Sequence, residues 1–277
     1  MRRPQQLKNK KLLAGPYLFW AAAFVIIPLI MIFYYGFTDN DGAFTLTNLA
    51  GIASAENLKA LGLSLVLSLI STAVCLVLAY PLATILIDLN IGKSGFLVVV
   101  FVLPMWMNFL LRTMAWQTLL EKNGVINTFL SLFGLEPLAL INTPGAIVLG
   151  MVYNFLPFMI LPIYNVLCKM DQDVINAARD LGASPRQTFT KIIWPLSLPG
   201  VISGITMVFI PALTTFVISD LLGGSKILLI GNVIEQSFTQ ANDWHVGSGL
   251  SLVLMIFIIF SMMFMQKYDK NGEGGVF

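Results

Sequence analysis

The stretch NAARDLGASPRQTFTKIIWPLSLPG, residues 176–200, decides how the rest of this chain is interpreted. It is polar and favours short helices, yet apolar sequence lies on both sides of it. Of the 277 residues, 57% are hydrophobic and only 11% are charged, whereas about 25% of a soluble domain is charged. The composition therefore predicts an integral membrane protein, and it predicts that the quoted stretch is a loop between two membrane spans.

Six apolar stretches are long enough to cross a bilayer, which takes about 20 residues. The sequence predicts an all-α fold in one membrane domain, residues 1–277. The expected spans are 12–36, 61–87, 95–119, 144–167, 196–219 and 247–265. Only the third contains a charged residue, Arg112. No small-residue cleavage site follows the first apolar run, so we interpret it as an uncleaved span rather than a signal peptide.

The distribution of basic residues predicts the orientation. If both termini are cytoplasmic, 12 of the 16 Lys and Arg residues lie on the cytoplasmic side, and only Lys59, Lys122 and Lys226 lie outside. Cytoplasmic loops of membrane proteins carry an excess of Lys and Arg. The sequence therefore predicts a multi-pass protein of the cell (inner) membrane, with 168–195 as its largest cytoplasmic loop.

This loop has the start and stop signals of two short helices. Asp171 or Asp173 can cap a first helix, and Gly182 can end it because glycine accepts a left-handed conformation. Ser184 and Gln187 form a capping box for a second helix. These residues predict a helix–glycine–helix element. By themselves they leave open whether it docks onto a partner or rests on lipid headgroups.

The pattern Ala177-Ala178, Gly182, Ile192 and Pro195 resembles the coupling motif of binding-protein-dependent ABC importer permeases. In that family the element docks into a cleft on a cytoplasmic ATPase. The resemblance implies that the residues for ATPase coupling here are Asn176, Ala177, Ala178, Asp180, Leu181, Gly182 and Ala183.

Two residues depart from the family pattern. Asn176 stands where the family usually has glutamate, and Trp194 stands where it has leucine. Asn176 keeps a polar surface but carries no charge, which puts a salt bridge from this site to the ATPase in doubt.

The resemblance extends beyond the loop. The segments LPMWMNFLLRTMAW (103–116), NFLPFMILPIY (154–164) and SDLLGGSKILLIGNVI (219–234) are similar to permeases of spermidine/putrescine importers. This implies the six-helix fold of type I importer permeases, which form half of a translocation pathway. It also implies three kinds of partner: a second homologous permease, two copies of a cytoplasmic ABC ATPase, and an external polyamine-binding protein.

The same resemblance implies a non-catalytic subunit that binds no cofactor, with ATP and Mg²⁺ held by the partner ATPase. The chain's own IGKS segment, residues 91–94, does not form a P-loop, because Ile87 occupies the position of the first glycine.

Several polar and aromatic residues are candidates for the translocation pathway or its gate. A charge at membrane depth marks function by default, although Arg112 could also extend toward the interface. Polyamine recognition takes carboxylates and aromatic faces, whereas a bare arginine suits an anion better. We therefore expect Arg112 to pair with an acid, with Asp220 and Glu235 as candidates. The full candidate set is Trp106, Asn108, Arg112, Tyr153, Asn154, Asp220 and Glu235.

Other interpretations remain open from the sequence. The importer could carry another cargo, such as ferric ion, sulfate, molybdate or a small organic solute. Two further alternatives belong to other classes. One is a secondary transporter or channel driven by ion gradients, which the coupling loop argues against. The other is a membrane-embedded enzyme. The spans contain no His/Asp/Glu cluster for catalysis, and the one histidine, His245, cannot make a histidine-based metal site alone. A net charge of +2 gives no reason to expect nucleic acid as a partner.

Overall fold

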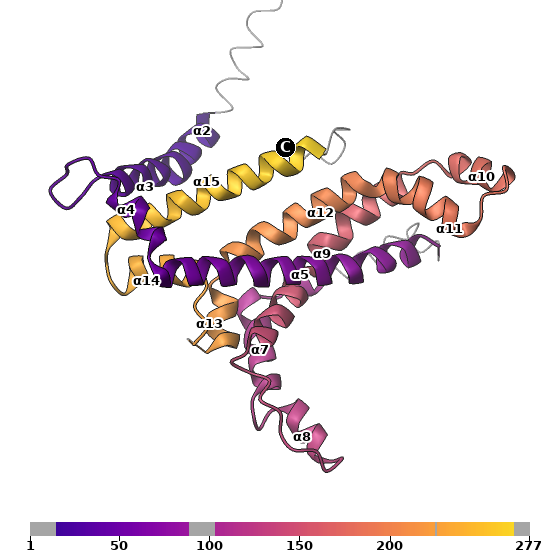
Figure 1. Ribbon diagram of the computed structural model, residues 1–277, viewed down its shortest axis with the longest axis horizontal. Coiled ribbons are helices and arrows are strands. Elements are labelled where there is room, and N and C mark those ends of the chain that lie inside the picture. The colour runs from indigo at the N-terminus through magenta and orange to yellow at the C-terminus, as the bar shows by residue number, and fades with distance from the viewer. Residues whose placement is uncertain (1–14, 89–102, 225, 269–277) are drawn as a thin grey trace, which may run out of the picture. The chain divides into compact units, whose positions relative to one another are not determined.

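The computed structural model describes residues 15–88, 103–224 and 226–268, and within these ranges every regular element is a helix (Figure 1). The α-helices are α2 (Gly15–Ala21), α3 (Ile27–Phe37), α4 (Thr47–Ala50), α5 (Ala55–Asp88), α7 (Phe109–Leu120), α8 (Val125–Ser131), α9 (Pro144–Cys168), α10 (Gln172–Asp180), α11 (Pro185–Thr188), α12 (Trp194–Thr214), α13 (Val217–Gly223), α14 (Ile230–Thr239) and α15 (Trp244–Tyr268). The predicted all-α class is confirmed.

Five helical segments in the described ranges are long and apolar enough to cross a membrane. They are Gly15–Phe37, Ala55–Ile87, Pro144–Cys168, Pro185–Thr214 and Trp244–Met265. The first part of the remaining expected span, 95–119, lies outside the described residues, and so does the IGKS segment before it, 91–94. Its described part is a 3-10 turn, Leu103–Trp106, followed by the 12-residue helix α7. That part is therefore two short pieces separated at Met107–Asn108.

Two of the spans contain a short π-helical segment just before a proline. Ala22–Ile26 precedes Pro28, and Phe189–Ile193 precedes Pro195. A proline inside a helix removes one hydrogen bond and crowds the carbonyl four residues earlier. That residue falls inside the π-helical segment in both cases, so the wider turn accommodates the proline and the helix continues. Helix α11 consequently runs into α12 as one segment, Pro185–Thr214.

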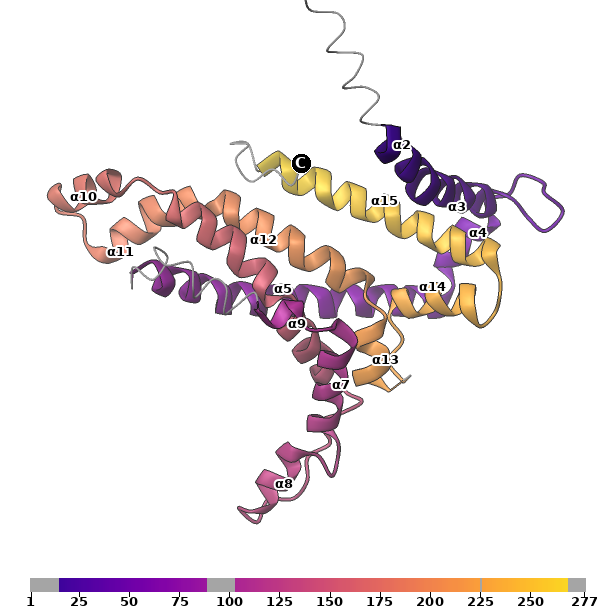
Figure 2. The same ribbon diagram turned by 180° about the vertical axis from the view of Figure 1, so that it is seen from behind.

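The chain divides into two compact units, residues 1–58 with 234–257 and residues 59–233 with 258–277. In the second unit α9 and α12 pack side by side, as both Figure 1 and Figure 2 show. A Cβ atom on Gly200 would lie 2.8 Å from the Pro162 carbonyl oxygen, and one on Gly204 would lie 2.7 Å from the sulfur of Met159. The two glycines therefore allow close helix contact, as their four-residue spacing predicts.

The fifth expected span, 196–219, ends earlier than the apolar pattern predicts. Helix α12 stops at Thr214, and α13 begins at Val217. The start of α14 lies against this break, because a Cβ on Gly231 would be 2.7 Å from the Thr214 carbonyl oxygen. The side-chain amide of Asn232 also donates to the Phe216 carbonyl at 3.1 Å. The break is thus stabilised by a segment distant in sequence, which hydrophobicity alone cannot reveal.

In the first unit the C-terminal end of α3 is held by side chains. Asn48 donates to the carbonyls of Tyr35, Gly36 and Thr38 at 3.2, 3.3 and 2.8 Å. The Nδ1 atom of His245 lies 2.6 Å from the Thr38 carbonyl oxygen. The last carbonyls of a helix have no partners within it, so these two side chains fix where α3 ends.

Candidate functional site

The loop between α10 and α11 forms the predicted helix–glycine–helix element. Asp171 caps α10 by accepting from the Asp173 amide at 2.9 Å. Gly182 has a φ of +81°, its amide donates to Arg179 at 2.9 Å, and the Ala183 amide donates to Ala178 at 3.0 Å. This pair of bonds is a Schellman motif. The turn therefore depends on a left-handed backbone that glycine adopts without strain.

The second helix of the element begins at the predicted capping box. The Gln187 amide donates to Ser184 Oγ at 3.3 Å, and the Ser184 amide donates to Gln187 Oε1 at 2.9 Å. The helix continues through α12, and Tyr80 of α5 contacts its first turns. The Tyr80 ring lies 5.2 Å from that of Trp194, and its hydroxyl is 2.8 Å from Ser197 Oγ. The element is therefore continuous with α12, and the first turns of α12 are in direct contact with α5.

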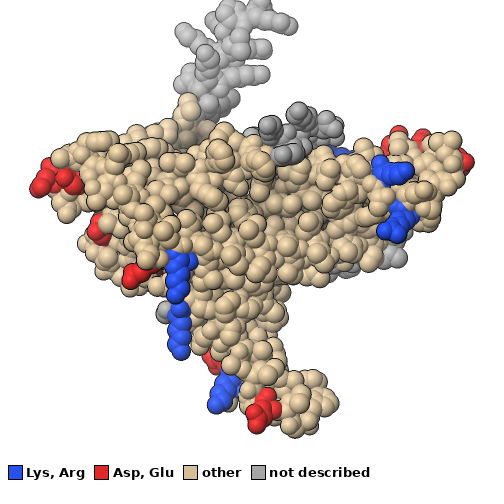
Figure 3. Space-filling view, viewed as in Figure 1, with Lys and Arg blue, Asp and Glu red and all other residues tan. Residues whose placement is uncertain are grey.

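The free surface of the element is small and apolar at its centre, with charges around it. Leu181 is 88% exposed, while Ile175 on the same loop is buried and anchors α10. Ala177 and Asn176 are exposed, and Ala178 is half-buried. Charged side chains of both signs gather where α10 and α11 lie, whereas most of the visible surface is uncharged (Figure 3). The exposed leucine beside alanines gives the element an apolar surface of the kind that packs into a hydrophobic groove.

Arg112 is the one pathway candidate whose charge is buried. It is only 7% exposed, and its Nε and Nη1 atoms are buried without a hydrogen-bond partner. Its Cζ lies 6.0 Å from the centre of the Tyr153 ring, which is at the outer limit of a cation–π contact. Trp116 lies edge-on to Tyr153, with 5.4 Å between ring centres. Helices α7 and α9 therefore bring a guanidinium and two aromatic rings together.

Asn154 lies on the same pair of helices and is 1% exposed. Its side-chain amide donates to the Gly150 carbonyl at 2.9 Å and to Thr113 Oγ1 at 3.4 Å. The bond to Thr113 is an interhelical hydrogen bond between α9 and α7. Its Oδ1 atom is buried without a hydrogen-bond partner. Arg112 and Asn154 thus leave both buried donors and a buried acceptor available to a further group.

Asp220 lies on α13 and is oriented by α14. Its Oδ1 accepts from the Asn232 side-chain amide at 2.6 Å. The expected pairing of Arg112 with an acid stays a prediction. The side-chain amide of Asn232 satisfies its own hydrogen bonds through Asp220 and the Phe216 carbonyl.

The remaining candidates are placed as follows. Asn108 is the N-cap of α7 and accepts from the amides of Leu110 and Leu111 at 2.8 and 3.3 Å, which is a structural role. Trp106 is 79% exposed on the 3-10 turn before it. Glu235 belongs to the first unit and accepts from Thr239 Oγ1 at 2.9 Å. The described residues contain no group of three or more His, Cys, Asp or Glu side chains that could hold a metal.

Gly223 and Gly224 form a packed turn at the end of α13. Gly224 caps α13 with a φ of +61°, and a Cβ there would overlap the Oδ1 atom of Asn142. A Cβ on Gly223 would lie 2.9 Å from Ile147 Cδ1. Close packing therefore leaves no room for a side chain at either position.

Sequence reasoning missed two residues of the site. Asn232 is fully buried and positions Asp220, and the signal available was an amide within the apolar run LLIGNVI. Tyr80 of α5 contacts Trp194 and Ser197 in the first turns of α12. In the sequence it is one more aromatic residue of an apolar span. No local pattern marks such a contact, because its partners are more than 100 residues away.

These features define a class: a helical membrane protein with several spans, in which a helix–glycine–helix element continues directly into a spanning helix. The chain belongs to the family of binding-protein-dependent transport system inner membrane components, whose model matches residues 12–269. It is therefore a multi-pass inner-membrane transport permease.

Individual relatives agree with this assignment. The chain is 40% identical over 245 residues to the spermidine/putrescine transport system permease protein PotB of Escherichia coli K12, covering 86% of this chain and 89% of that protein. It is 30% identical over 277 residues to the inner membrane ABC transporter permease protein YdcU of the same organism, covering 92% and 88%.

Among solved structures, the chain is similar to a subunit of a bacterial alginate ABC transporter crystallised in complex with an alginate pentasaccharide-bound periplasmic protein. The TM-score is 0.78 over 98% of this chain and 100% of that one, at 16% sequence identity. At this identity the match establishes the fold of an ABC importer permease and nothing about cargo.

Proposed function

We propose that this chain is a permease subunit of an ATP-driven importer of spermidine and putrescine. The proposed cargo rests on the 40% identity to PotB over 86% of the chain. The importer would be completed by a second homologous permease, two copies of a cytoplasmic ABC ATPase, and an external polyamine-binding protein. ATP and Mg²⁺ would bind to the ATPase.

The geometry of α10 and α11 supports the coupling role. The exposed Leu181 and Ala177 would enter a groove of the ATPase, and the Gly182 turn fixes the angle between the two helices. From Pro185 the helix runs without a break for 30 residues, which is about 45 Å at 1.5 Å per residue. A displacement of the docked end would therefore reach the far end of α12, where α13 and Asp220 lie.

The test is to reconstitute the chain with its co-expressed partners in vesicles. We expect spermidine presented by its binding protein to stimulate ATP hydrolysis and to accumulate in the vesicles. Spermidine that gives neither response, while another solute gives both, would overturn the cargo and leave the family assignment unaffected.

One observation favours a different cargo. Arg112 is a buried cation with two unpartnered nitrogen atoms, which suits an anion such as sulfate or molybdate better than a polyamine. The same vesicles decide between the two: sulfate or molybdate should leave ATP hydrolysis at its basal rate if the cargo is a polyamine.

A further inference from the structure

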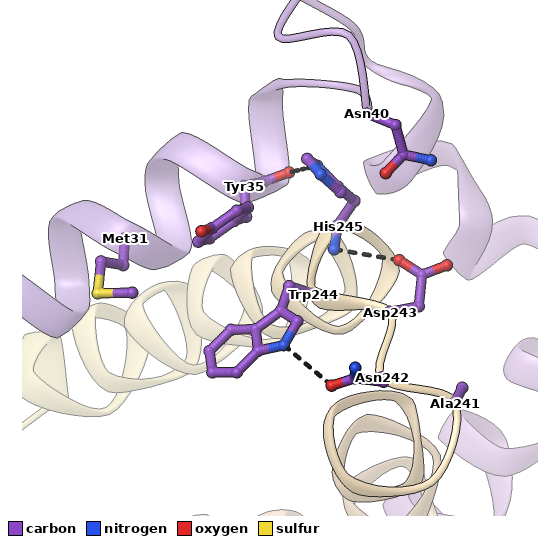
Figure 4. A pocket seen from close by; sticks show the side chains of 8 residues that line it. All are labelled: Met31, Tyr35, Asn40, Ala241, Asn242, Asp243, Trp244 and His245. Carbon is purple, nitrogen blue, oxygen red and sulfur yellow. Dashed lines mark hydrogen bonds between the residues drawn. The ribbon is translucent and has the colours of Figure 1, made fainter.

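The first unit contains a hollow that none of the pathway candidates lines. Its volume is about 480 Å³, within the usual range of small-ligand sites. The side chains that line it come from α3, the loop after it, the loop before α15 and the start of α15 (Figure 4): Met31, Tyr35, Asn40, Ala241, Asn242, Asp243, Trp244 and His245. The orientation predicted from the sequence places this end of both helices on the external face.

Two aromatic rings form a wall of the hollow, and both are held in place. The centres of the Tyr35 and Trp244 rings are 5.9 Å apart. Trp244 is fixed edge-on against Phe238 at 5.5 Å, and its Nε1–H lies 3.4 Å from Asn242 Oδ1. Tyr35 is fixed edge-on against His245 at 5.2 Å. Aromatic faces held in this way attract ammonium groups and cover methylene chains.

His245 supports this wall without needing a charge. Its Nδ1 lies 2.6 Å from the Thr38 carbonyl oxygen and 3.1 Å from that of Tyr35. Both neighbours can only accept, so Nδ1 carries a proton and donates it. A neutral imidazole satisfies this arrangement, and the ring therefore places no obligatory positive charge beside the hollow.

Asp243 supplies a carboxylate at the edge of the hollow. Its Oδ1 caps α15, accepting from the amides of His245 and Val246 at 3.1 and 3.0 Å. The cap uses one oxygen atom and leaves Oδ2 for a ligand. The surroundings are also acidic: the described residues of this unit, 15–58 and 234–257, include no Lys or Arg but five acids, namely Asp39, Asp41, Glu56, Glu235 and Asp243.

We propose that this hollow is an external binding site for a primary ammonium group on an aliphatic chain. The ammonium would lie against Asp243 Oδ2 and the amide oxygen of Asn40, and the chain would lie across Tyr35 and Trp244. Two sources provide this chemistry, a soluble polyamine and the headgroup of phosphatidylethanolamine. The site goes beyond the proposed function, which supplies only the reason to choose spermidine as the first probe.

The test uses the assembled transporter in a maltoside detergent, without its binding protein. A spermidine analogue carrying a photoreactive diazirine is crosslinked, and the labelled peptides are mapped by mass spectrometry. We expect label on residues 31–40 and 241–245, displaced by unlabelled spermidine and not by a neutral diol of equal length. A parallel sample with short-chain phosphatidylethanolamine identifies the source: stronger displacement by the lipid assigns the site to headgroups, and weaker displacement assigns it to soluble amines.

Variants separate charge from folding. Asp243→Asn keeps an oxygen for the helix cap and should weaken spermidine competition about five-fold, which corresponds to about 1 kcal/mol. Tyr35→Leu should weaken it similarly, while Tyr35→Phe retains the ring face and should bind normally. Glu56→Gln removes a charge of the same unit away from the hollow and serves as the control.

Two results would overturn the proposal: label on these segments that spermidine does not displace, or equal competition in Asp243→Asn and the unmodified protein. Because crosslinking is read without transport, it remains informative if spermidine proves not to be the cargo. Failure of the proposed function and failure of this site are therefore distinguishable.

Discussion

The two ends of α12 are built on different principles. At the end joined to α11, the turns of the helix–glycine–helix element are formed locally: Asp171, Gly182 and Ser184 each act on residues within four positions. At the other end, the break at Thr215 and the position of Asp220 depend on Asn232, 12 or more residues away. Arg112 likewise obtains its surroundings from α9. Local signals therefore determine the turn of the helix–glycine–helix element, whereas long-range contacts determine the surroundings of the pathway candidates Arg112 and Asp220.

This contrast predicts that the largest effect comes from the backbone of the local element. Gly182→Val places a β-branched residue at a φ of +81°, which costs about 1–2 kcal/mol in the left-handed region. Since the space around the missing Cβ is empty, the strain is purely conformational. We expect the Schellman turn to open and uptake in reconstituted vesicles to fall more than about ten-fold, an effect that corresponds to about 1.4 kcal/mol.

A matched variant tests that reasoning. Gly182→Asn adds a side chain of similar bulk that tolerates the left-handed conformation, and it should retain most of the uptake. Membrane insertion, checked by fractionation, should be normal in both. Equal loss in the Asn and Val variants would mean that the surface of the loop matters and its backbone conformation does not.

The same contrast explains what could be predicted from the sequence. The five spans, the cap of α10, the Gly182 turn and the capping box follow from hydrophobicity and from residue types at fixed spacing. The break after Thr214 could not be predicted, because Gly231 and Asn232 stabilise it from another helix. The hydrogen bond from Asn232 to Asp220 could not be predicted either, because charge alone points to Arg112 and does not indicate an amide 12 residues away. Charge complementarity identifies possible partners, and only packing selects among them.

The second prediction concerns the long-range end. Asp220→Asn removes the charge but keeps an oxygen that can accept from Asn232, so α13 should remain folded. If a polyamine passes this carboxylate, loss of an ion pair worth up to about 1 kcal/mol should lower spermidine uptake about five-fold. The measurement is uptake and spermidine-stimulated ATP hydrolysis in vesicles.

Asp171→Asn is the matched control for this change. It removes one negative charge at the cytoplasmic end, and Asn also caps helices well, so uptake should be nearly unchanged. Undiminished spermidine transport by Asp220→Asn would remove Asp220 from the pathway. An equal decrease in both variants would assign the effect to net charge and would erase the difference between the two ends.

The smallest effect is expected from the capping box, because its loss affects only the first turn of a helix that is 30 residues long. Ser184→Ala removes the bond to the Gln187 amide, and loss of such a cap costs about 1 kcal/mol. The rest of the helix is held by α9 and by Tyr80, so fraying should stay local. We expect hydrogen exchange of peptides covering 184–188 to quicken about five-fold, while uptake changes less than about two-fold.

Ser184→Asp, which can also cap, should restore slow exchange. If Ser184→Ala instead abolishes uptake as Gly182→Val is expected to do, the coupling element acts as one cooperative unit, and the cap and the turn cannot be separated as local features.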